Sequence, residues 1–122
     1  MPRILVVDDE PPLRELVVVT LGDGYQCDEA GDGEEALERL HDGEYDLVLL
    51  DVMMPGRSGL DVLREMRGDE RLRDVPVVVL SAWQTQEDVD AARDAGGTAF
   101  LPKPFPPEDL AAAVDALVPR AA

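Results

Sequence analysis

Short apolar runs alternate along this chain with stretches in which apolar residues recur every three or four positions. The apolar runs, which predict strands, lie at 3–7, 25–30, 46–51, 76–80 and 98–101. The helically spaced stretches lie at 11–21, 34–40, 60–66, 86–95 and 108–118. This alternation predicts an α/β fold, a doubly wound parallel sheet of five strands with five helices and right-handed crossovers. No linker or internal repeat interrupts it, so residues 1–122 are expected to form one domain.

Prolines, glycines and one unusually apolar run refine this outline. Pro11 and Pro12 suit the start of the first helix, and Gly22 and Gly24 are expected simply to end it. The run 46–51 is almost continuously apolar, which is typical of a strand that is buried on both faces.

Polar residues follow the expected strands at matching places. Asp8 and Asp9 follow the first strand, Asp51 ends the third, Ser81 ends the fourth, and Lys103 follows the fifth. In doubly wound sheets, ligands bind outside the carboxyl ends of the strands. We therefore expect these side chains to share one crevice. Folding alone does not require such a cluster, so it is the best guide to function.

Crowded carboxylates at this edge would favour a metal ion. If Asp8, Asp9 and Asp51 lie within about 5 Å of one another, each like-charged pair costs about 3 kcal/mol at an effective dielectric of about 20. Lys103 offsets part of this repulsion, and Mg²⁺, which prefers a few carboxylates plus waters, would offset the rest. The alternative is that the three acids are ordinary loop residues that point into solvent.

A carboxylate beside a divalent cation and a lysine is also a good acceptor for a phosphoryl group. Ser81 would donate a hydrogen bond to a phosphoryl oxygen, although a plain strand-terminating serine is the simpler interpretation of this residue. Other phosphate-binding classes lack their motifs, because the chain contains neither a glycine-rich dinucleotide loop nor a P-loop.

Composition narrows the function classes further. The chain has 122 residues and a formal charge of −16, from 27 acidic and 11 basic residues. This charge has the wrong sign for direct nucleic-acid binding. The single cysteine excludes an internal disulfide and a cysteine-based zinc site. No apolar stretch approaches the roughly 18–20 residues that span a bilayer, and no signal peptide is visible, so a cytoplasmic protein without membrane contact is expected.

Four short motifs resemble those of one protein family. They are Ile4-Leu5-Val6-Val7-Asp8-Asp9-Glu10, Asp51-Val52-Met53-Met54-Pro55 with Gly59, Ser81-Ala82, and Lys103-Pro104-Phe105. Each motif is weak alone, but all four in this order and spacing are specific. The chain resembles, over its full length, the response-regulator receiver domains of two-component signalling. That resemblance implies a flavodoxin-like fold with strand order 2-1-3-4-5.

The resemblance also implies roles for the residues of the crevice. Asp51 would be the phospho-acceptor. Asp9 and Asp51 would bind Mg²⁺, or alternatively Mn²⁺, together with the main-chain carbonyl of Met53. Asp8 would act largely through a bound water. Lys103 would pair with the phosphoryl group and would precede a cis peptide bond.

A switch pair is implied as well, with some departures from the family pattern. The Ser81 hydroxyl would move to the phosphoryl group while the Phe100 ring turns inward behind it. Phe100 is often Tyr in this family, so no phenol is available here. Trp83 is bulkier than usual at its position. It is either a gate over the site that slows loss of phosphate, or a partner-binding or merely exposed residue.

These observations predict a phosphorylation-activated signalling switch. It would accept a phosphoryl group from a histidine kinase or phosphotransfer protein and alter the surface of its fourth helix, fifth strand and fifth helix. It would catalyse only its own phosphoryl transfer and autodephosphorylation, and would therefore not be an enzyme. The first alternative is a phosphate-independent interaction module. The second is the excised receiver of a DNA-binding regulator or hybrid kinase. The stretch 108–118 lacks basic residues, which argues against the salt-bridged dimer of winged-helix regulators.

Overall fold

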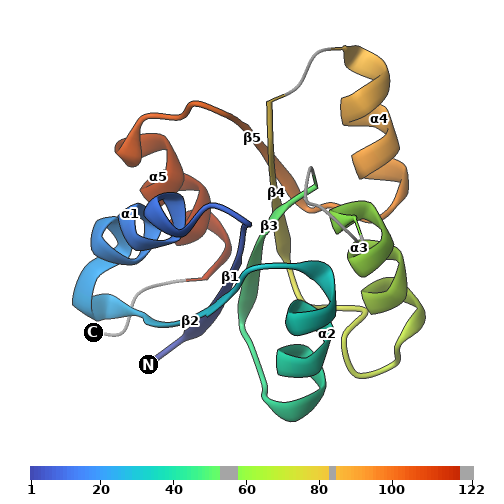
Figure 1. Ribbon diagram of the computed structural model, residues 1–122, viewed down its shortest axis with the longest axis horizontal. Coiled ribbons are helices and arrows are strands. Elements are labelled where there is room, and N and C mark those ends of the chain that lie inside the picture. The colour runs from blue at the N-terminus through green and yellow to red at the C-terminus, as the bar shows by residue number, and fades with distance from the viewer. Residues whose placement is uncertain (53–57, 83–84, 119–122) are drawn as a thin grey trace.

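The computed structural model describes residues 1–52, 58–82 and 85–118, which form a parallel sheet between two layers of helices (Figure 1). The strands are β1 (Arg3–Val7), β2 (Gln26–Ala30), β3 (Leu47–Asp51), β4 (Val77–Ser81) and β5 (Ala99–Pro102). The helices are α1 (Pro11–Leu21), α2 (Gly33–Asp42), α3 (Gly59–Gly68), α4 (Gln86–Asp94) and α5 (Pro107–Leu117). The strand order is β2-β1-β3-β4-β5 with all pairs parallel, as expected.

Successive side chains along the strands point alternately into two separate hydrophobic cores. On β1, Ile4 and Val6 pack with α1 and α5, whereas Leu5 and Val7 pack with α2 and α3. Figure 1 shows the same division, with α1 and α5 on one side of the sheet and α2, α3 and α4 on the other. Every residue of β3 and β4 is buried, and β3 confirms the prediction that the apolar run 46–51 forms a strand buried on both faces.

Local sequence signals fix where the helices begin. The side chains of Asp32, Ser58 and Thr85 accept hydrogen bonds from main-chain N–H groups in the first turns of α2, α3 and α4. Helices α1 and α5 instead begin at a proline, whose missing N–H is not needed there. One expectation was incomplete, because Gly22–Gly24 do not merely end α1 but form a short 3₁₀ turn that leads into β2.

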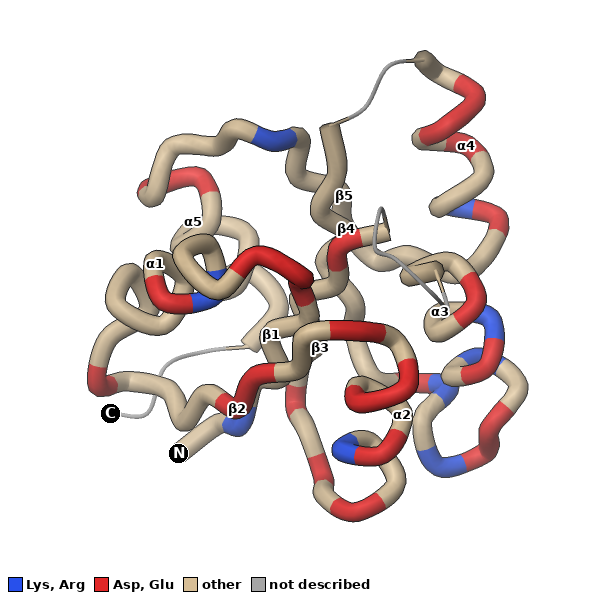
Figure 2. Tube along the Cα trace, in the orientation of Figure 1, with Lys and Arg blue, Asp and Glu red and all other residues tan. Residues whose placement is uncertain are grey.

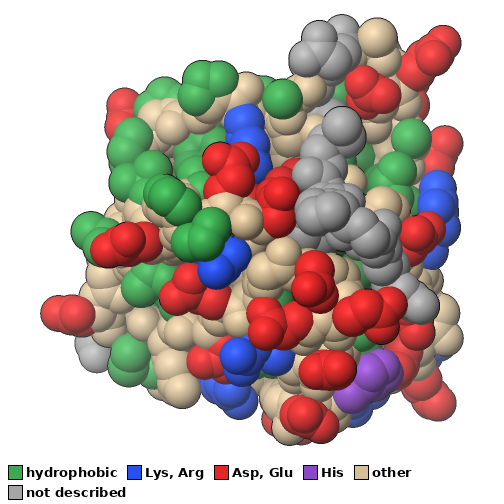
Figure 3. Space-filling model, in the orientation of Figure 1, with side chains coloured by type: hydrophobic (Ala, Val, Ile, Leu, Met, Phe, Trp, Pro, Cys, Tyr) green, Lys and Arg blue, Asp and Glu red, His purple; other side chains and the backbone are tan. Residues whose placement is uncertain are grey.

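The surface is strongly acidic. Asp and Glu positions, red on the backbone trace in Figure 2, occur in all the helices. Hydrophobic side chains gather over α1 and α5 on the face shown in Figure 3. Leu16 and Val19 of α1 are the large aliphatic residues exposed in the interior of this helix. Within the described ranges, no helix is both long and apolar enough to cross a membrane.

Candidate functional site

The register of the strands brings the predicted residues to one edge of the sheet. Val7 of β1 lies opposite Leu50 of β3, so Asp8 and Asp51, which follow them, lie side by side. Ser81 of β4 lies opposite Pro102, and the N–H of Lys103 donates to the Ser81 main-chain oxygen at 2.8 Å. The parallel arrangement thus assembles side chains that are up to 95 residues apart in the chain.

Lys103 connects two buried carboxylates. Its Nζ lies 2.6 Å from Oδ2 of Asp8 and 3.2 Å from Oδ2 of Asp51. Asp8 is fully buried and Asp51 is 2% exposed. Burial lowers the pKa of Lys103, but its hydrogen bond to Asp8 and the charge of Asp51 outweigh that effect, so the pKa is raised overall. The lysine therefore stays protonated and offsets part of the charge of both carboxylates.

A cluster of carboxylates lies at the mouth of this site. Ligand oxygens of Asp8, Asp9 and Glu10 all lie within 4.8 Å of one another, and Asp9 and Glu10 are exposed. Such hard oxygen donors fit Mg²⁺ chemistry. Among the described residues, Asp51 is outside this group of three and is linked to it through Lys103. Two predicted residues, Met53 and Trp83, lie outside the described ranges.

Glu10 was not predicted as part of the site. Its Oε1 lies 3.8 Å from the Lys103 Nζ, so it supplies a third carboxylate near this ammonium group. Its position directly after Asp8 and Asp9 could have indicated that it belongs to the site. However, sequence alone does not determine whether a residue at a helix start turns toward the site or into solvent.

Gly59 is required for α3 to begin where it does. A Cβ atom on this residue would lie 2.3 Å from the main-chain oxygen of Asp51 and 2.6 Å from the Cα of Val52. No side chain fits at those distances, so glycine lets the first turn of α3 pack directly on the end of β3. The helix thereby buries the main chain that carries Asp51.

Ser81 and Phe100 share one face of the sheet. Phe100 lies opposite Val79, two residues before Ser81 on β4, and side chains two apart on a strand point to the same side. Ser81 is 3% exposed and Phe100 is half-buried against the core formed with α2, α3 and α4. The guanidinium of Arg93 from α4 lies 5.4 Å from the centre of the Phe100 ring.

A family model described as the response regulator receiver domain matches residues 4–115. This chain belongs to the response regulator receiver domain family. The conclusion agrees with the resemblance drawn from the four motifs.

Several receiver-containing proteins are similar to this one. The phosphate regulon transcriptional regulatory protein PhoB of Escherichia coli strain K12 is 40% identical over 119 residues, which cover 97% of this chain and 52% of PhoB. The DNA-binding response regulator MtrA of Mycolicibacterium smegmatis is 42% identical, with coverage of 97% and 51%. This receiver domain thus spans about half the length of these curated relatives.

Solved structures show the same architecture. The chemotaxis protein CheY4 of Vibrio cholerae superposes with a TM-score of 0.91 at 31% identity, covering 97% of this chain and 99% of CheY4. The response regulator TrrA of Thermotoga maritima, solved in complex with Mg²⁺-BeF, gives a TM-score of 0.85 at 41% identity, covering 97% and 100%.

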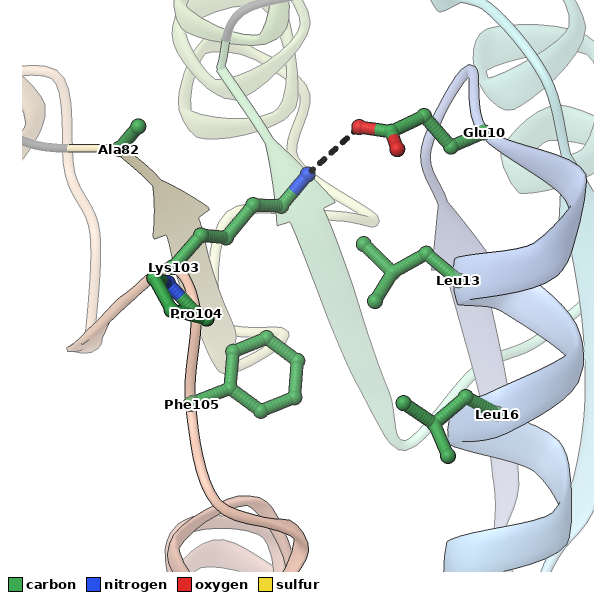
Figure 4. Close-up of a pocket in the computed structure, with 7 residues that line it drawn as sticks. All are labelled: Glu10, Leu13, Leu16, Ala82, Lys103, Pro104 and Phe105. Carbon is green, nitrogen blue, oxygen red and sulfur yellow. Dashed lines mark ion pairs between the residues drawn. The ribbon is translucent and has the colours of Figure 1, made fainter.

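In this receiver domain, an apolar groove of about 440 Å³ opens beside Lys103. The Lys103–Pro104 peptide bond is cis, as the family resemblance implied. Figure 4 shows the Phe105 ring facing Leu13 and Leu16 of α1 across the groove, with the Lys103–Glu10 ion pair at one end. The phosphoryl-acceptor candidate and an apolar surface are therefore neighbours.

Proposed function

We propose that this receiver domain is a phosphorylation-activated switch in which Asp51 accepts a phosphoryl group from a phosphohistidine. The observation that carries the proposal is the pair of buried carboxylates, Asp8 and Asp51, that share the single ammonium group of Lys103. Ordinary packing does not favour two buried acids for one cation, because each buried charge costs several kcal/mol to desolvate. A site that must accept a cation and a phosphoryl group does favour it.

The oxygen-rich donor set fits a resident Mg²⁺, and Mn²⁺ would suit the same ligands. Asp9 and Asp51 would hold the ion, together with the main-chain carbonyl of Met53, while Asp8 would act through a bound water. When bound, the ion supplies positive charge that stabilises the oxygens of the transferred phosphoryl group.

The transfer itself requires little from the protein beyond positioning. An oxygen of Asp51 forms a bond to phosphorus as the bond from phosphorus to the donor imidazole nitrogen breaks. The electron pair of that bond stays on the nitrogen, and the imidazole leaves neutral because its other ring nitrogen already carries a proton. Lys103, already 3.2 Å from Asp51, would contact a phosphoryl oxygen. The protein acts only on its own Asp51, in transfer and in autodephosphorylation, so we do not class it as an enzyme.

The added charge would then move the switch pair. The Ser81 hydroxyl would donate to a phosphoryl oxygen, and the Phe100 ring, now half-buried, would turn inward behind it. The surface that changes would be formed by α4, β5 and α5. Arg93 would respond directly, because its guanidinium lies over the Phe100 ring.

The phosphodonor would bind at the groove between α1 and the loop that follows β5. This apolar surface borders Lys103, and the exposed Leu16 extends it along α1. We expect Phe105→Ala to slow transfer from a phosphorylated histidine phosphotransfer protein but not from phosphoramidate, which is too small to need the groove. The formal charge of −16 makes direct nucleic-acid binding by this domain unfavourable.

Phosphorylation by a small donor tests the proposal without a kinase. Phosphoramidate with Mg²⁺ should add one phosphoryl group, seen by intact mass, and the product should be acid-stable and base-labile. Asp51→Ala should abolish the addition, whereas the exposed Asp23→Asn should leave it unchanged. Equal labelling of the Asp51→Ala variant would move the chemistry elsewhere. No labelling of any form would favour a phosphate-independent interaction module.

A further inference from the structure

Arg14 of α1 makes two directed contacts at the acidic edge of the sheet. Its Nη1 donates to the main-chain oxygen of Asp8 at 2.5 Å, and its Nε donates to Oε1 of Glu29 on β2 at 3.0 Å. The Arg14 side chain is 18% exposed, whereas that of Glu29 is 46% exposed. Because the Glu29 side chain is so exposed, its ion pair with Arg14 contributes little to stability by itself. The contact with the Asp8 carbonyl is the distinctive one.

The contact with Arg14 adds to the other hydrogen bonds that hold Asp8 in place. The Asp8 N–H donates to the Ala30 oxygen at 3.1 Å. One carboxylate oxygen accepts from the Glu10 N–H at 2.9 Å, and the other accepts from Lys103. Among the described residues, Arg14 is the hydrogen-bond partner of the main-chain carbonyl of this buried residue. That carbonyl belongs to the planar peptide unit that joins Asp8 to Asp9, so holding it fixes the plane from which the Asp9 side chain departs.

We propose that Arg14 is a positioning residue for the cation site, which orients the Asp8–Asp9 peptide so that both carboxylates face the ion. The inference rests on the proposed function, because it presupposes that this cluster binds Mg²⁺. A guanidinium suits the task, because its rigid fork places Nε on Glu29 while Nη1 reaches the carbonyl. The single ammonium of a lysine is a point charge and cannot reproduce this geometry.

A positioning role and a purely electrostatic role of Arg14 predict opposite changes in Mg²⁺ affinity for the same substitution. Arg14 carries a positive charge beside a site that attracts a cation, so its charge alone weakens Mg²⁺ binding. If only charge matters, Arg14→Gln tightens binding. If positioning matters, Arg14→Gln and Arg14→Lys both weaken it, although the lysine variant keeps the charge. Residues that support metal ligands typically contribute tenfold or more to affinity, so we expect the Kd for Mg²⁺ to rise about tenfold.

The experiment is a calorimetric Mg²⁺ titration of the unphosphorylated wild-type protein, both Arg14 variants and Arg64→Gln. Arg64 on α3 is a matched control, because its side chain is 59% exposed and its ion-pair partner within the described part of the chain is the exposed Asp61 on the same helix. Thermal melts without and with Mg²⁺ accompany each titration. They verify folding and show whether a variant lowers the Mg²⁺-dependent gain in Tm, which a purely structural role would leave unchanged.

The outcomes separate the inference from the function on which it rests. A weaker Kd in both Arg14 variants, with Arg64→Gln near wild type, supports positioning. If Arg14→Gln does not fold, the Arg14→Lys titration decides. Wild-type affinity in Arg14→Lys, or tighter binding by Arg14→Gln, overturns the inference and leaves the proposed function intact. If the wild-type protein itself binds no Mg²⁺, the cation site fails and the inference fails with it.

Discussion

Two clusters of charged side chains lie on this sheet, and they differ in charge balance. Near the amino ends of β1 and β3, Arg3 pairs with Asp28 at 2.7 Å and lies over the Tyr45 ring at 4.8 Å. The Tyr45 hydroxyl donates to the same carboxylate at 2.6 Å. In this group, the amino-end cluster, one guanidinium pairs with one partly buried carboxylate, and the exposed Asp46 accepts from the Arg3 main-chain N–H at 2.8 Å. At the opposite edge, one ammonium serves two buried carboxylates, with two exposed ones nearby.

The difference indicates which cluster is built for a ligand. The carboxylate of the amino-end cluster is stabilised from within. The Tyr45 hydrogen bond, followed by Arg3, lowers the pKa of Asp28 against the opposing effect of burial. The acidic edge instead keeps an excess of negative charge where Asp8 and Asp51 are out of water. Excess charge in a buried place requires a partner from outside the chain. A balanced cluster requires none and serves stability.

The largest effect is expected when the cation is removed from each cluster in turn. Lys103→Met leaves two buried carboxylates without their ammonium partner and should lower the free energy of unfolding by about 3 kcal/mol in the absence of Mg²⁺. Arg3→Met breaks a partly exposed pair and should lower the free energy of unfolding much less. Urea unfolding with and without Mg²⁺ measures both. At one fixed Mg²⁺ concentration, ten times the wild-type Kd, the ion should add about 1.4 kcal/mol to the wild type and to Arg3→Met, whose cation site is intact. It should add more to Lys103→Met, because that variant lacks the ammonium group that repels the ion. Equal rescue of both variants would contradict the contrast.

A pH series examines the amino-end cluster on its own. Burial, followed by the hydrogen bond to Asp28, raises the pKa of Tyr45 from its ordinary value of 10.0 to about 12. A raised pKa means that the folded state favours the protonated phenol. The contribution is therefore complete below pH 10 and is lost as the pH rises through about 12. The full contribution is about 3 kcal/mol, of which about 2 kcal/mol is lost between pH 10 and pH 12.

The matching variant is Tyr45→Phe, which cannot ionise. The loss of stability between pH 10 and pH 12 should be smaller in this variant than in the wild-type protein, by about 2 kcal/mol, in urea unfolding at fixed salt. Parallel curves for the two proteins would show that Tyr45 is not held in its protonated form by this cluster.

The sequence predicted the acidic edge better than the contacts that surround it. Strand periodicity places Asp8, Asp51 and Ser81 at strand ends, and parallel strands bring those ends together whatever the side-chain rotamers are. The contacts of Arg14 and Arg93 depend on rotamers and on the seating of helices, which periodicity does not determine. Each residue reads as an ordinary surface arginine in its helix. The 3₁₀ turn at Gly22–Gly24 was missed for a similar reason, because glycines that end a helix also permit a further tight turn.

Removing one acid from the crowded edge should stabilise the metal-free protein. Asp51→Asn deletes a charge that is 2% exposed, while Asp8 retains its 2.6 Å contact with Lys103. Buried ion groups are often replaced without loss or with a gain, so we expect about 1 kcal/mol of added stability. The gain in Tm from Mg²⁺ should shrink at the same time. The control is Asp28→Asn in the amino-end cluster, which should destabilise. A stabilised control would show that charge excess does not distinguish the two clusters.

The smallest expected effect concerns the two ring contacts of arginine. Arg3 lies over Tyr45 in a cluster with no proposed motion, whereas Arg93 lies 5.4 Å from Phe100, the proposed switch residue. A partly exposed cation–π contact contributes about 0.5 kcal/mol. Arg93→Gln should therefore barely change the free energy of unfolding. It should, however, remove a contact that favours the resting position of the ring.

Loss of this contact should make the inward position of the Phe100 ring easier to reach. If the contact exists only in the resting position, its removal shifts the equilibrium toward the inward position by about 0.5 kcal/mol, or roughly twofold. Beryllofluoride with Mg²⁺, a mimic of the phosphoryl group, should then bind Arg93→Gln about twofold more tightly than wild type, as followed by amide chemical shifts. Arg64→Gln makes the same change of charge away from Phe100 and should bind as wild type does. Weaker binding by Arg93→Gln would mean that Arg93 stabilises the inward position instead, and that α4 assists the switch rather than restraining it.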